Sequence, residues 1–290
     1  MITISSPTLW VITGATAVGK TEYAIKLAQR YNSCILSADS RQFYKEMKIG
    51  TASPTAEELA AVPHYFVGNL SIHDYYNVSM FETEVLALLD RLFQQHNVVV
   101  MTGGSGLYID AVCKGVDNMP DPEDEVRQYV MQLWQTEGID ALRSRLQFLD
   151  PTYCKTADMA NYKHLVRALE VCIQTGCPYS SFRKGTTKKR PFTIVKQCLE
   201  RPRMELFARI NQRVDLMMQQ GLLEEARNLY PYKHLNALNT VGYKELFDYF
   251  DGKLSLERAV EDIKTHTRRY AKRQMTWFKR DGEYQYVNQF

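Results

Sequence analysis

The segment Gly14-Ala15-Thr16-Ala17-Val18-Gly19-Lys20-Thr21 constrains the fold of this chain more than any other feature. It fits the pattern of a phosphate-binding loop (P-loop). An apolar run, 9–13, precedes it, and the segment 20–31 that follows has apolar residues at helical spacing. Glycines let backbone N–H groups close around phosphate oxygens, and the N-terminus of the following helix adds positive potential. The sequence therefore predicts a phosphate site in which Lys20 adds a full charge and Thr21 ligates Mg²⁺. The loop alone does not choose between ATP, another nucleotide and a diphosphate ester.

The same alternation of apolar runs and amphipathic segments continues beyond the loop. Residues 34–38 and 98–102 are typical of buried strands, and residues 80–95 have the period of a helix. Continuous apolar strands that alternate with helices indicate a parallel sheet covered on both faces. We therefore expect an α/β core that resembles the P-loop NTPases.

A change in composition after residue 116 predicts a domain boundary. Two prolines and five acidic residues lie between 117 and 125, and the segments 125–148 and 162–174 that follow have helical periodicity. Strand character returns only at 192–199, and the chain is expected to be helical from 204 onward. We interpret this as a first part of the core (1–116), a helical insertion domain (117–188), and the last strand with a helical C-terminal region (189–290).

Composition excludes several classes of protein. Hydrophobic residues make up 45% of the chain and charged residues 24%, so a disordered or fibrous protein is excluded. The N-terminal residues lack a basic start followed by a long apolar core, and we expect a cytoplasmic monomer without membrane attachment. The net charge of +3 is small, but residues 263–280 carry seven Lys or Arg and no acidic residue. Such a run is typical of a nucleic-acid contact or of a solvated helix face.

Two further motifs are expected beside the P-loop, because the carboxyl ends of parallel strands share one edge of a sheet. Asp39 follows the second predicted strand, where it either holds Mg²⁺ through water or takes a proton from a nucleophile. The third predicted strand ends in Gly103-Gly104-Ser105-Gly106, which places backbone amides and the Ser105 hydroxyl there.

Taken in order along nearly the whole chain, the motifs resemble those of the tRNA dimethylallyltransferase (tRNA isopentenyltransferase) family. After the P-loop they are Asp39-Ser40-x-Gln42-x-Tyr44, Ile49-Gly50-Thr51-Ala52-x-Pro54, Gly103-Gly104-Ser105-Gly106-Leu107-Tyr108, Arg167-Ala168-Leu169-Glu170, Val241-Gly242-Tyr243-Lys244-Glu245 and Thr267-Arg268-x-Tyr270-Ala271-Lys272-Arg273-Gln274-x-Thr276-Trp277-Phe278. The chain departs from the family pattern at Ala15, Tyr65, Ser105 and Lys163-His164, where the family usually has Pro, His, Thr and Gln-Arg.

The resemblance implies a reaction and a role for each motif. The N6 amine of adenosine-37, next to the tRNA anticodon, would attack C1 of dimethylallyl diphosphate and release pyrophosphate, giving N6-(dimethylallyl)adenosine. It implies Asp39 as the general base, Ser105 as the group that orients the amine, and Lys20 with Mg²⁺ on Thr21 as stabilisers of the leaving group. Diphosphate contacts would come from the P-loop, Gly14 to Thr21, and from Arg209 and Arg213.

The resemblance also implies a set of tRNA contacts, because the adenine must leave its stack to reach a buried carboxylate. The implied residues are Asp39, Ser40, Arg41, Gln42, Ser105, Arg127, Lys163, His164, Leu165, Val166, Arg167, Asn239, Thr240, Val241, Gly242, Tyr243, Lys244, Arg268, Arg269, Lys272 and Arg273. Lys279 and Arg280 extend the basic set.

Two alternatives remain open from the residues themselves. A small-molecule kinase would use Lys20 and Thr21 to hold ATP and Mg²⁺, Asp39 to deprotonate a hydroxyl, and the insertion as a lid. An RNA-binding or nucleotide-sensing module without catalysis would leave an aspartate opposite a P-loop unexplained.

Overall fold

The chain divides into two units. The computed structural model describes residues 6–288; the five N-terminal residues on which the localisation prediction rests lie outside them, as do the last two. One unit comprises Met1–Cys113 and Lys189–Phe290, and the other comprises Lys114–Lys188. The second unit begins at Lys114, whereas the predicted insertion domain begins at residue 117, and the division into domains stays a prediction. The Lys188 amide donates to the Lys114 carbonyl at 2.7 Å, so the first and last residues of the second unit are hydrogen-bonded to each other.

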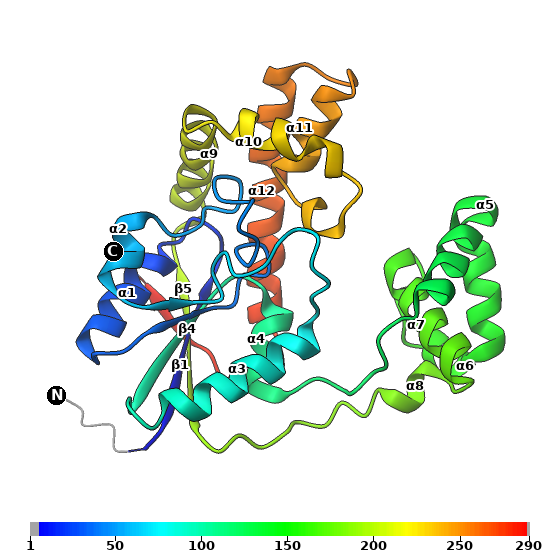
Figure 1. Ribbon diagram of the computed structural model, residues 1–290, viewed down its shortest axis with the longest axis horizontal. Helices are drawn as coiled ribbons and strands as arrows, with labels where there is room; N and C mark the ends of the chain where they lie inside the picture. The colour runs from blue at the N-terminus through cyan, green and yellow to red at the C-terminus, as the bar shows by residue number, and fades with distance from the viewer. Residues whose placement is uncertain (1–5, 289–290) are drawn as a thin grey trace. The chain divides into compact units, whose positions relative to one another are not determined.

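The first unit is built on a six-stranded parallel sheet (Figure 1). Its strand order is β3-β2-β4-β1-β5-β6, and every pairing in it is parallel. The strands are β1 (Thr8–Gly14), β2 (Ile35–Ser37), β3 (His64–Tyr65), β4 (Val98–Thr102), β5 (Thr193–Glu200) and β6 (Gln285–Asn288). The α/β fold class predicted from the sequence is confirmed. β1, β2 and β4 lie side by side, so the loops after them reach one edge of the sheet.

Helices bury both faces of this sheet. Along β4, Val99 and Met101 pack in one hydrophobic cluster with α3 (Val78–Leu92) and α4 (Gly106–Lys114), whereas Val100 packs in a second cluster with α1 (Lys20–Arg30) and α9 (Arg203–Gln219). Alternate residues of a strand point to opposite faces, which is why a strand buried on both sides reads as a continuous apolar run. The helices of this unit are α1 (Lys20–Arg30), α2 (Ala56–Ala61), α3 (Val78–Leu92), α4 (Gly106–Lys114), α9 (Arg203–Gln219), α10 (Leu222–Leu229), α11 (Tyr243–Phe250) and α12 (Leu256–Phe278), with short 3₁₀ turns η1 (Tyr230–Tyr232) and η2 (Asn236–Leu238).

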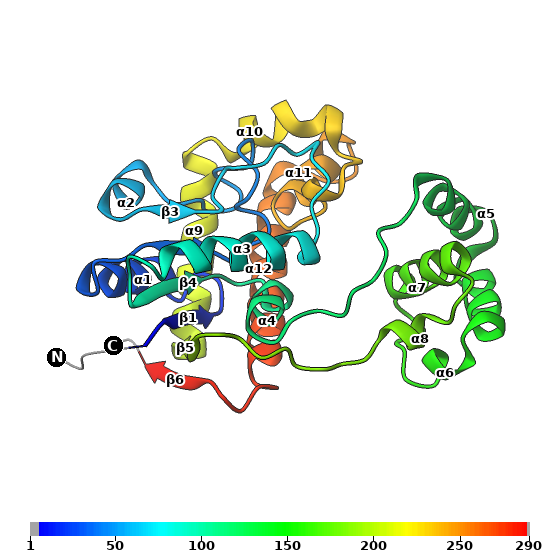
Figure 2. The same cartoon turned by 60° about the horizontal axis from the view of Figure 1, so that its bottom comes forward.

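The prediction that the chain is helical from residue 204 to its end was wrong at β6. This strand pairs in parallel with β5, Gln197 opposite Gln285 and Glu200 opposite Asn288 (Figure 2). β6 lies at the edge of the sheet and its side chains are mostly exposed. An edge strand needs no continuous apolar run, so the sequence carried little signal for it.

The second unit is helical, as the sequence predicted. It contains α5 (Asp124–Leu149), α6 (Pro151–Cys154), α7 (Tyr162–Thr175) and α8 (Tyr179–Phe182). Its core includes Leu133 and Leu146 of α5 and Leu169 of α7, and the ring of Trp134 stacks on Tyr162 at 4.0 Å between centroids. Gly138, with φ of 79° and ψ of −170°, interrupts the helical backbone of α5. The single regular helix expected over 125–148 is therefore two segments joined by a kink.

Within residues 6–288, helices long and apolar enough to cross a membrane are absent.

Candidate active site

The P-loop joins β1 to α1 and presents its backbone to a cavity. Gly14 has φ of +137°, and a Cβ there would lie 2.7 Å from the Leu199 carbonyl oxygen, so glycine is required. Gly19 has φ of 109° and precedes the first turn of α1, which among the described residues has no side-chain cap. The first N–H groups of α1 are therefore left for an anionic ligand.

This P-loop cavity has a volume of about 260 Å³ and is mostly polar. It is lined by Thr16, Ala17, Gly19, Lys20, Thr21, Glu22, Asp39, Gln42, Thr51, Ala52, Glu58, Thr102, Gly103, Arg209, Arg213, Tyr270 and Gln274. The side chains of Ala15 and Val18 line a different cavity on the other side of the loop. Those two predicted phosphate-binding residues can therefore contribute only backbone groups.

Lys20 is the first residue of α1, and its side chain reaches back to the start of the loop. Its ammonium group donates to the carbonyls of Gly14 at 3.1 Å and Ala15 at 2.9 Å. Burial lowers the pKa of Lys20 to about 8, opposed by the nearby Asp39 carboxylate and reinforced by the positive charge of Arg213. A poorly hydrated cation in this position gains more from an anionic ligand than an exposed lysine does.

Two arginines of α9 add to the positive charge. Arg209 donates from Nε to the Ala17 carbonyl at 2.9 Å, and Arg213 lies 3.5 Å from the Thr16 hydroxyl. Burial lowers the pKa of Arg213, and the charge of Arg209 acts in the same direction. The structure thus brings both arginines predicted as diphosphate contacts to the P-loop, where the carboxylates of Glu22, Asp39 and Glu58 also line the cavity.

Asp39 lies where two cavities meet. It lines the P-loop cavity and also a smaller side cavity of about 110 Å³, and its Oδ1 accepts from the Arg41 amide at 3.1 Å. Thr16, Thr51, Ala52, Arg213 and Tyr270 line both cavities as well. A carboxylate at this junction faces the cationic loop on one side and the side cavity on the other.

One face of α12 closes both cavities, and sequence reasoning missed its contribution to the site. Gln274 is buried, accepts from the Thr16 amide at 2.8 Å and donates to the Gly104 carbonyl at 3.0 Å. Tyr270 lines both cavities, and burial raises the pKa of its hydroxyl. Gln274 thus ties the P-loop to the loop after β4. Tyr270 and Gln274 could have been found from the sequence, because their spacing within the motif 267–278 places both on one face of a helix.

Ser105 lies beside Asp39 but is engaged with its neighbour. Its hydroxyl accepts from the Ser40 amide at 3.0 Å and donates to the Ser40 hydroxyl at 3.1 Å. These bonds hold the turn that carries Asp39. The predicted contact between Ser105 and a substrate amine stays a prediction.

Close packing between the ends of β2 and β4 also fixes Asp39. A Cβ at Gly103 would lie 2.4 Å from the backbone of Ala38, the residue before Asp39. We expect Gly103→Ala to lower the free energy of unfolding by about 1–3 kcal/mol, because the backbone must shift to relieve the overlap. Thermal and urea unfolding measure the loss. Gly282→Ala is the matched control, since a Cβ there meets nothing described within 4 Å; equal stability of the two variants would contradict the packing argument.

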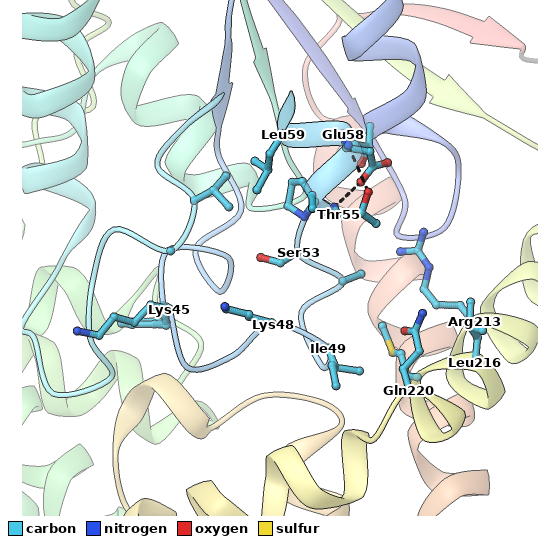
Figure 3. A pocket seen from close by; sticks show the side chains of 18 residues that line it. Lys45, Lys48, Ile49, Ser53, Thr55, Glu58, Leu59, Arg213, Leu216 and Gln220 are labelled. Atoms are coloured by element: carbon cyan, nitrogen blue, oxygen red, sulfur yellow. Dashed lines mark hydrogen bonds between the residues drawn. The ribbon is translucent and has the colours of Figure 1, made fainter. Parts of the chain in front are cut away.

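A third cavity, of about 720 Å³, adjoins the P-loop cavity (Figure 3). Arg213 lies at its border, with Lys48 and Ser53 on the loop before α2. The Thr55 hydroxyl accepts from the Glu58 amide at 3.2 Å and the Glu58 carboxylate from the Thr55 amide at 2.8 Å, which fixes the start of α2 beside it.

The basic residues predicted on α12 lie mostly on the helix face opposite the cavities. Ile263, Thr267, Tyr270 and Gln274 are spaced to share one face. Arg268, Arg269, Lys272 and Lys279 line a fourth cavity, of about 470 Å³, behind the P-loop. Arg273 lies over the Tyr270 ring, 5.7 Å from its centroid. The basic residues of α12 therefore do not form one continuous surface with the P-loop cavity and the side cavity.

The predicted contacts between 239 and 244 form a loop beside the side cavity. Thr240, Val241 and Gly242 line that cavity, and Lys244 is exposed. Tyr243 is fully buried, so its side chain is not open to RNA here, and the predicted contact from this residue stays a prediction for its backbone. Arg41 donates to the carbonyls of Asn236 and Ala237 at 3.0 and 2.9 Å, which connects this region to the Asp39 turn.

The remaining predicted RNA contacts belong to the second unit. Arg127, Lys163 and His164 are exposed there. Leu165 and Val166 pack in the core of that unit, so the contacts predicted from these two residues stay predictions for their backbone. Arg167 donates to the Pro120 carbonyl at 2.6 Å and lies 3.4 Å from Glu170.

The oxygen donors of the P-loop cavity suit a hard cation. Thr21 and Asp39 line the same cavity, but the described residues contain no cluster of three or more His, Cys, Asp or Glu side chains that suits a metal. Mg²⁺ typically binds through few protein oxygens together with water and substrate phosphates. The residues therefore fit a cation brought or completed by a phosphate ligand.

Comparison with known proteins gives matches over nearly the whole chain. The family described as IPP transferase matches residues 42–281. The chain is 54% identical to tRNA dimethylallyltransferase 1 of Phocaeicola vulgatus, covering 95% of this chain and 92% of that protein. It is 52% identical to tRNA dimethylallyltransferase 1 of Bacteroides fragilis, covering 97% and 93%.

Solved structures agree with these relatives. The full-length tRNA isopentenylpyrophosphate transferase of Bacillus halodurans is 34% identical with a TM-score of 0.70, covering 98% of this chain and 90% of that one. A eukaryotic dimethylallyltransferase acting on tRNA is 26% identical with a TM-score of 0.80, covering 98% and 74%. The resemblance drawn from the motifs is confirmed: the chain belongs to the IPP transferase family.

Proposed function

We propose that this protein transfers a dimethylallyl group from dimethylallyl diphosphate to N6 of adenosine-37 of tRNA. The observation that carries the proposal is the position of Asp39, which lines both the cationic P-loop cavity and the side cavity. Two relatives, 54% and 52% identical to this chain over the matched residues, are named tRNA dimethylallyltransferase, which supports the proposal. The chain is a prenyl-group transferase, and we do not retain the kinase alternative.

The P-loop cavity binds the diphosphate of the donor. Lys20, Arg209 and Arg213 supply positive charge, and the uncapped amides of α1 supply hydrogen-bond donors. As C1 of the dimethylallyl group bonds to N6, the bond from C1 to the ester oxygen of the adjacent phosphate breaks, and its electron pair leaves with pyrophosphate. Fixed cations and N–H groups stabilise the charge that develops there. Mg²⁺ held by the Thr21 hydroxyl would add Lewis-acid stabilisation of the same oxygens.

Asp39 accepts the proton that the N6 amine loses. An exocyclic amine is a weak nucleophile because its lone pair is delocalised into the adenine ring, so a carboxylate within hydrogen-bond reach assists the attack. The Arg41 amide and the bonded pair Ser40 and Ser105 hold this carboxylate at the junction of the cavities.

The tRNA contributes an unstacked adenine, because a base inside a stacked loop cannot reach a buried carboxylate. The side cavity, with Thr240 to Gly242 on one wall, takes this base. We further propose that residues 114–188 act as the helical insertion domain and contribute RNA contacts through Arg127, Lys163 and His164. Since its substrate is tRNA, we place the reaction in the cytoplasm, with the enzyme acting as a monomer.

Neutralising Arg268, Arg269, Lys272 and Arg273 together is expected to weaken tRNA binding and flatten its salt dependence. Each lost phosphate contact reduces the slope of log K against log salt by about 0.7–0.9. Binding isotherms at several salt concentrations measure it. The control neutralises four exposed cations that have acidic partners, Lys26, Arg227, Lys253 and Arg258. An equal slope in both variants would identify the α12 residues as a solvated face.

Pyrophosphate release tests the proposed reaction against its alternatives. We expect pyrophosphate to appear only when dimethylallyl diphosphate, tRNA and Mg²⁺ are all present, and ATP not to replace the dimethylallyl donor. Release of ADP from ATP with a small hydroxyl acceptor would support a kinase. Binding of tRNA or nucleotide without turnover of either donor would support a module without catalysis.

A further inference from the structure

Glu225, which neither the motifs nor the proposed chemistry involves, makes an unusual set of hydrogen bonds. It lies in α10, and its Oε2 accepts from the amides of Lys48 at 3.0 Å and Ile49 at 2.8 Å. Its Oε1 accepts from the Gly50 amide at 2.9 Å and from the Tyr243 hydroxyl at 2.7 Å. Three consecutive backbone N–H groups form a concave anion site, and here a side chain of the same protein occupies it.

The loop that Glu225 holds is a wall of the proposed active site. Gly50 lines the side cavity, and Thr51 and Ala52 line both that cavity and the P-loop cavity. Ala52 has φ of +49°, so this wall includes a residue in the left-handed region. Gln42 secures the far side of the wall, because its Nε2 donates to the carbonyls of Thr51 at 3.3 Å and Ala52 at 3.0 Å.

Tyr243 connects Glu225 to the opposite wall. It packs so closely under Gly50 that a Cβ there would lie 2.6 Å from two atoms of the Tyr243 ring and from its hydroxyl oxygen. Burial raises the pKa of the Tyr243 hydroxyl, as does the adjacent Glu225 carboxylate, so this hydroxyl stays a neutral donor. Tyr243 follows directly after Thr240 to Gly242, which line the other side of the side cavity.

We propose that Glu225 is a positioning residue that sets the separation of the two walls of the side cavity. One wall is 50–52 and the other 240–242. The carboxylate bonds to the first through the Gly50 amide, and to the hydroxyl of Tyr243, the residue that follows the second. This inference rests on the proposed function, in which that cavity takes the adenine next to Asp39. Glu225 touches no reacting atom in this scheme. It acts through the geometry of attack, where a displacement of about 1 Å costs about 100-fold in rate.

Glu225→Gln tests the proposal, with Glu224→Gln as matched control. Glutamine keeps the length of the side chain, but its NH₂ group cannot accept from backbone amides. Glu224 lies in the same turn, is exposed, and among the described residues pairs only with Arg227, at 3.5 Å. We expect Glu225→Gln to lower the single-turnover rate by about 10–100-fold. The affinity for dimethylallyl diphosphate should change by less than about twofold, because Lys20, Arg209 and Arg213 keep their contacts.

Tyr243→Phe provides a milder variant if Glu225→Gln folds poorly. It retains the ring under Gly50 and removes only the hydroxyl, so we expect a smaller loss of rate of the same kind. The double variant should lose less than the product of the two single losses, because the two side chains share one hydrogen bond. A wild-type rate in Glu225→Gln and in Tyr243→Phe, whatever their melting temperatures, would overturn the proposal.

Amide hydrogen exchange separates this proposal from the proposed function. The amides of 48–50 and 240–242 should exchange faster in Glu225→Gln than in Glu224→Gln, and this readout needs no turnover. If the wild-type protein transfers no dimethylallyl group but these amides still exchange faster in Glu225→Gln, the proposed function is refuted and the link between the two walls is supported. Unchanged exchange at these amides would refute the link.

Discussion

Asp39→Asn is expected to slow the chemical step by about 10²–10⁴-fold while both substrates still bind, because the amide keeps the size of the side chain but accepts no proton. Single-turnover rates at saturating tRNA and dimethylallyl diphosphate measure the step without mixing binding into it. Asp90→Asn, on the exposed surface of α3, is the control and should react like wild type.

A Mg²⁺ titration of the same variant distinguishes the two roles open to Asp39. If Asp39 is the general base, the Mg²⁺ concentration needed for the maximal rate should be nearly the same in Asp39→Asn and in wild type. A carboxylate that organises Mg²⁺ raises the Mg²⁺ requirement, and high Mg²⁺ restores the rate. Recovery to near the wild-type rate would contradict the role of Asp39 as base.

Lys20→Ala is expected to weaken binding of dimethylallyl diphosphate by about 10–100-fold, since hydrogen bonds to charged groups contribute about 1.5–3 kcal/mol. Turnover should fall further, because the charge on the leaving group grows in the transition state. Isothermal titration gives the affinity. Affinity for tRNA should stay close to wild type, since Lys20 lies in the P-loop cavity.

Two variants make the Lys20 result specific. Lys20→Met keeps the aliphatic stem and should show the same loss if the charge is responsible. Lys253→Ala removes an exposed lysine that pairs with Asp248 at 2.7 Å and lines neither the P-loop cavity nor the side cavity, and it should bind the diphosphate normally. Unchanged diphosphate binding in both Lys20 variants would show that the loop is not the diphosphate site.

The sequence predicted the fold where apolar periodicity was strong. The strands near 9–13 and 98–102 are buried on both faces, so their apolar runs identified them and the parallel sheet followed. β6 has mostly exposed side chains at the sheet edge and gave no such run. The kink at Gly138 was also missed, because helical period on either side of a glycine does not indicate its φ.

The sequence predicted those site residues that lie directly after a strand or within the P-loop motif. P-loop spacing placed Lys20 and Thr21, and the end of β2 placed Asp39, because the topology of a parallel sheet brings these loops to one edge. Tertiary packing decided the rest. Tyr243 lies in a recognised motif, but its side chain is buried in the hydrophobic core. Gln274 and Glu225 lie on helices far away in the sequence, yet they hydrogen-bond to the loops of the site.

Mass spectrometry of the tRNA tests the central claim most directly. Unmodified tRNA is incubated with the protein, dimethylallyl diphosphate and Mg²⁺, then digested so that each fragment and nucleoside is weighed. The account predicts that one fragment, the one containing adenosine-37, gains one dimethylallyl group in place of one hydrogen, and that its nucleoside is N6-(dimethylallyl)adenosine. A transcript with guanosine at that position should stay unmodified. Unchanged tRNA, or the added group on a different nucleotide, would contradict the account.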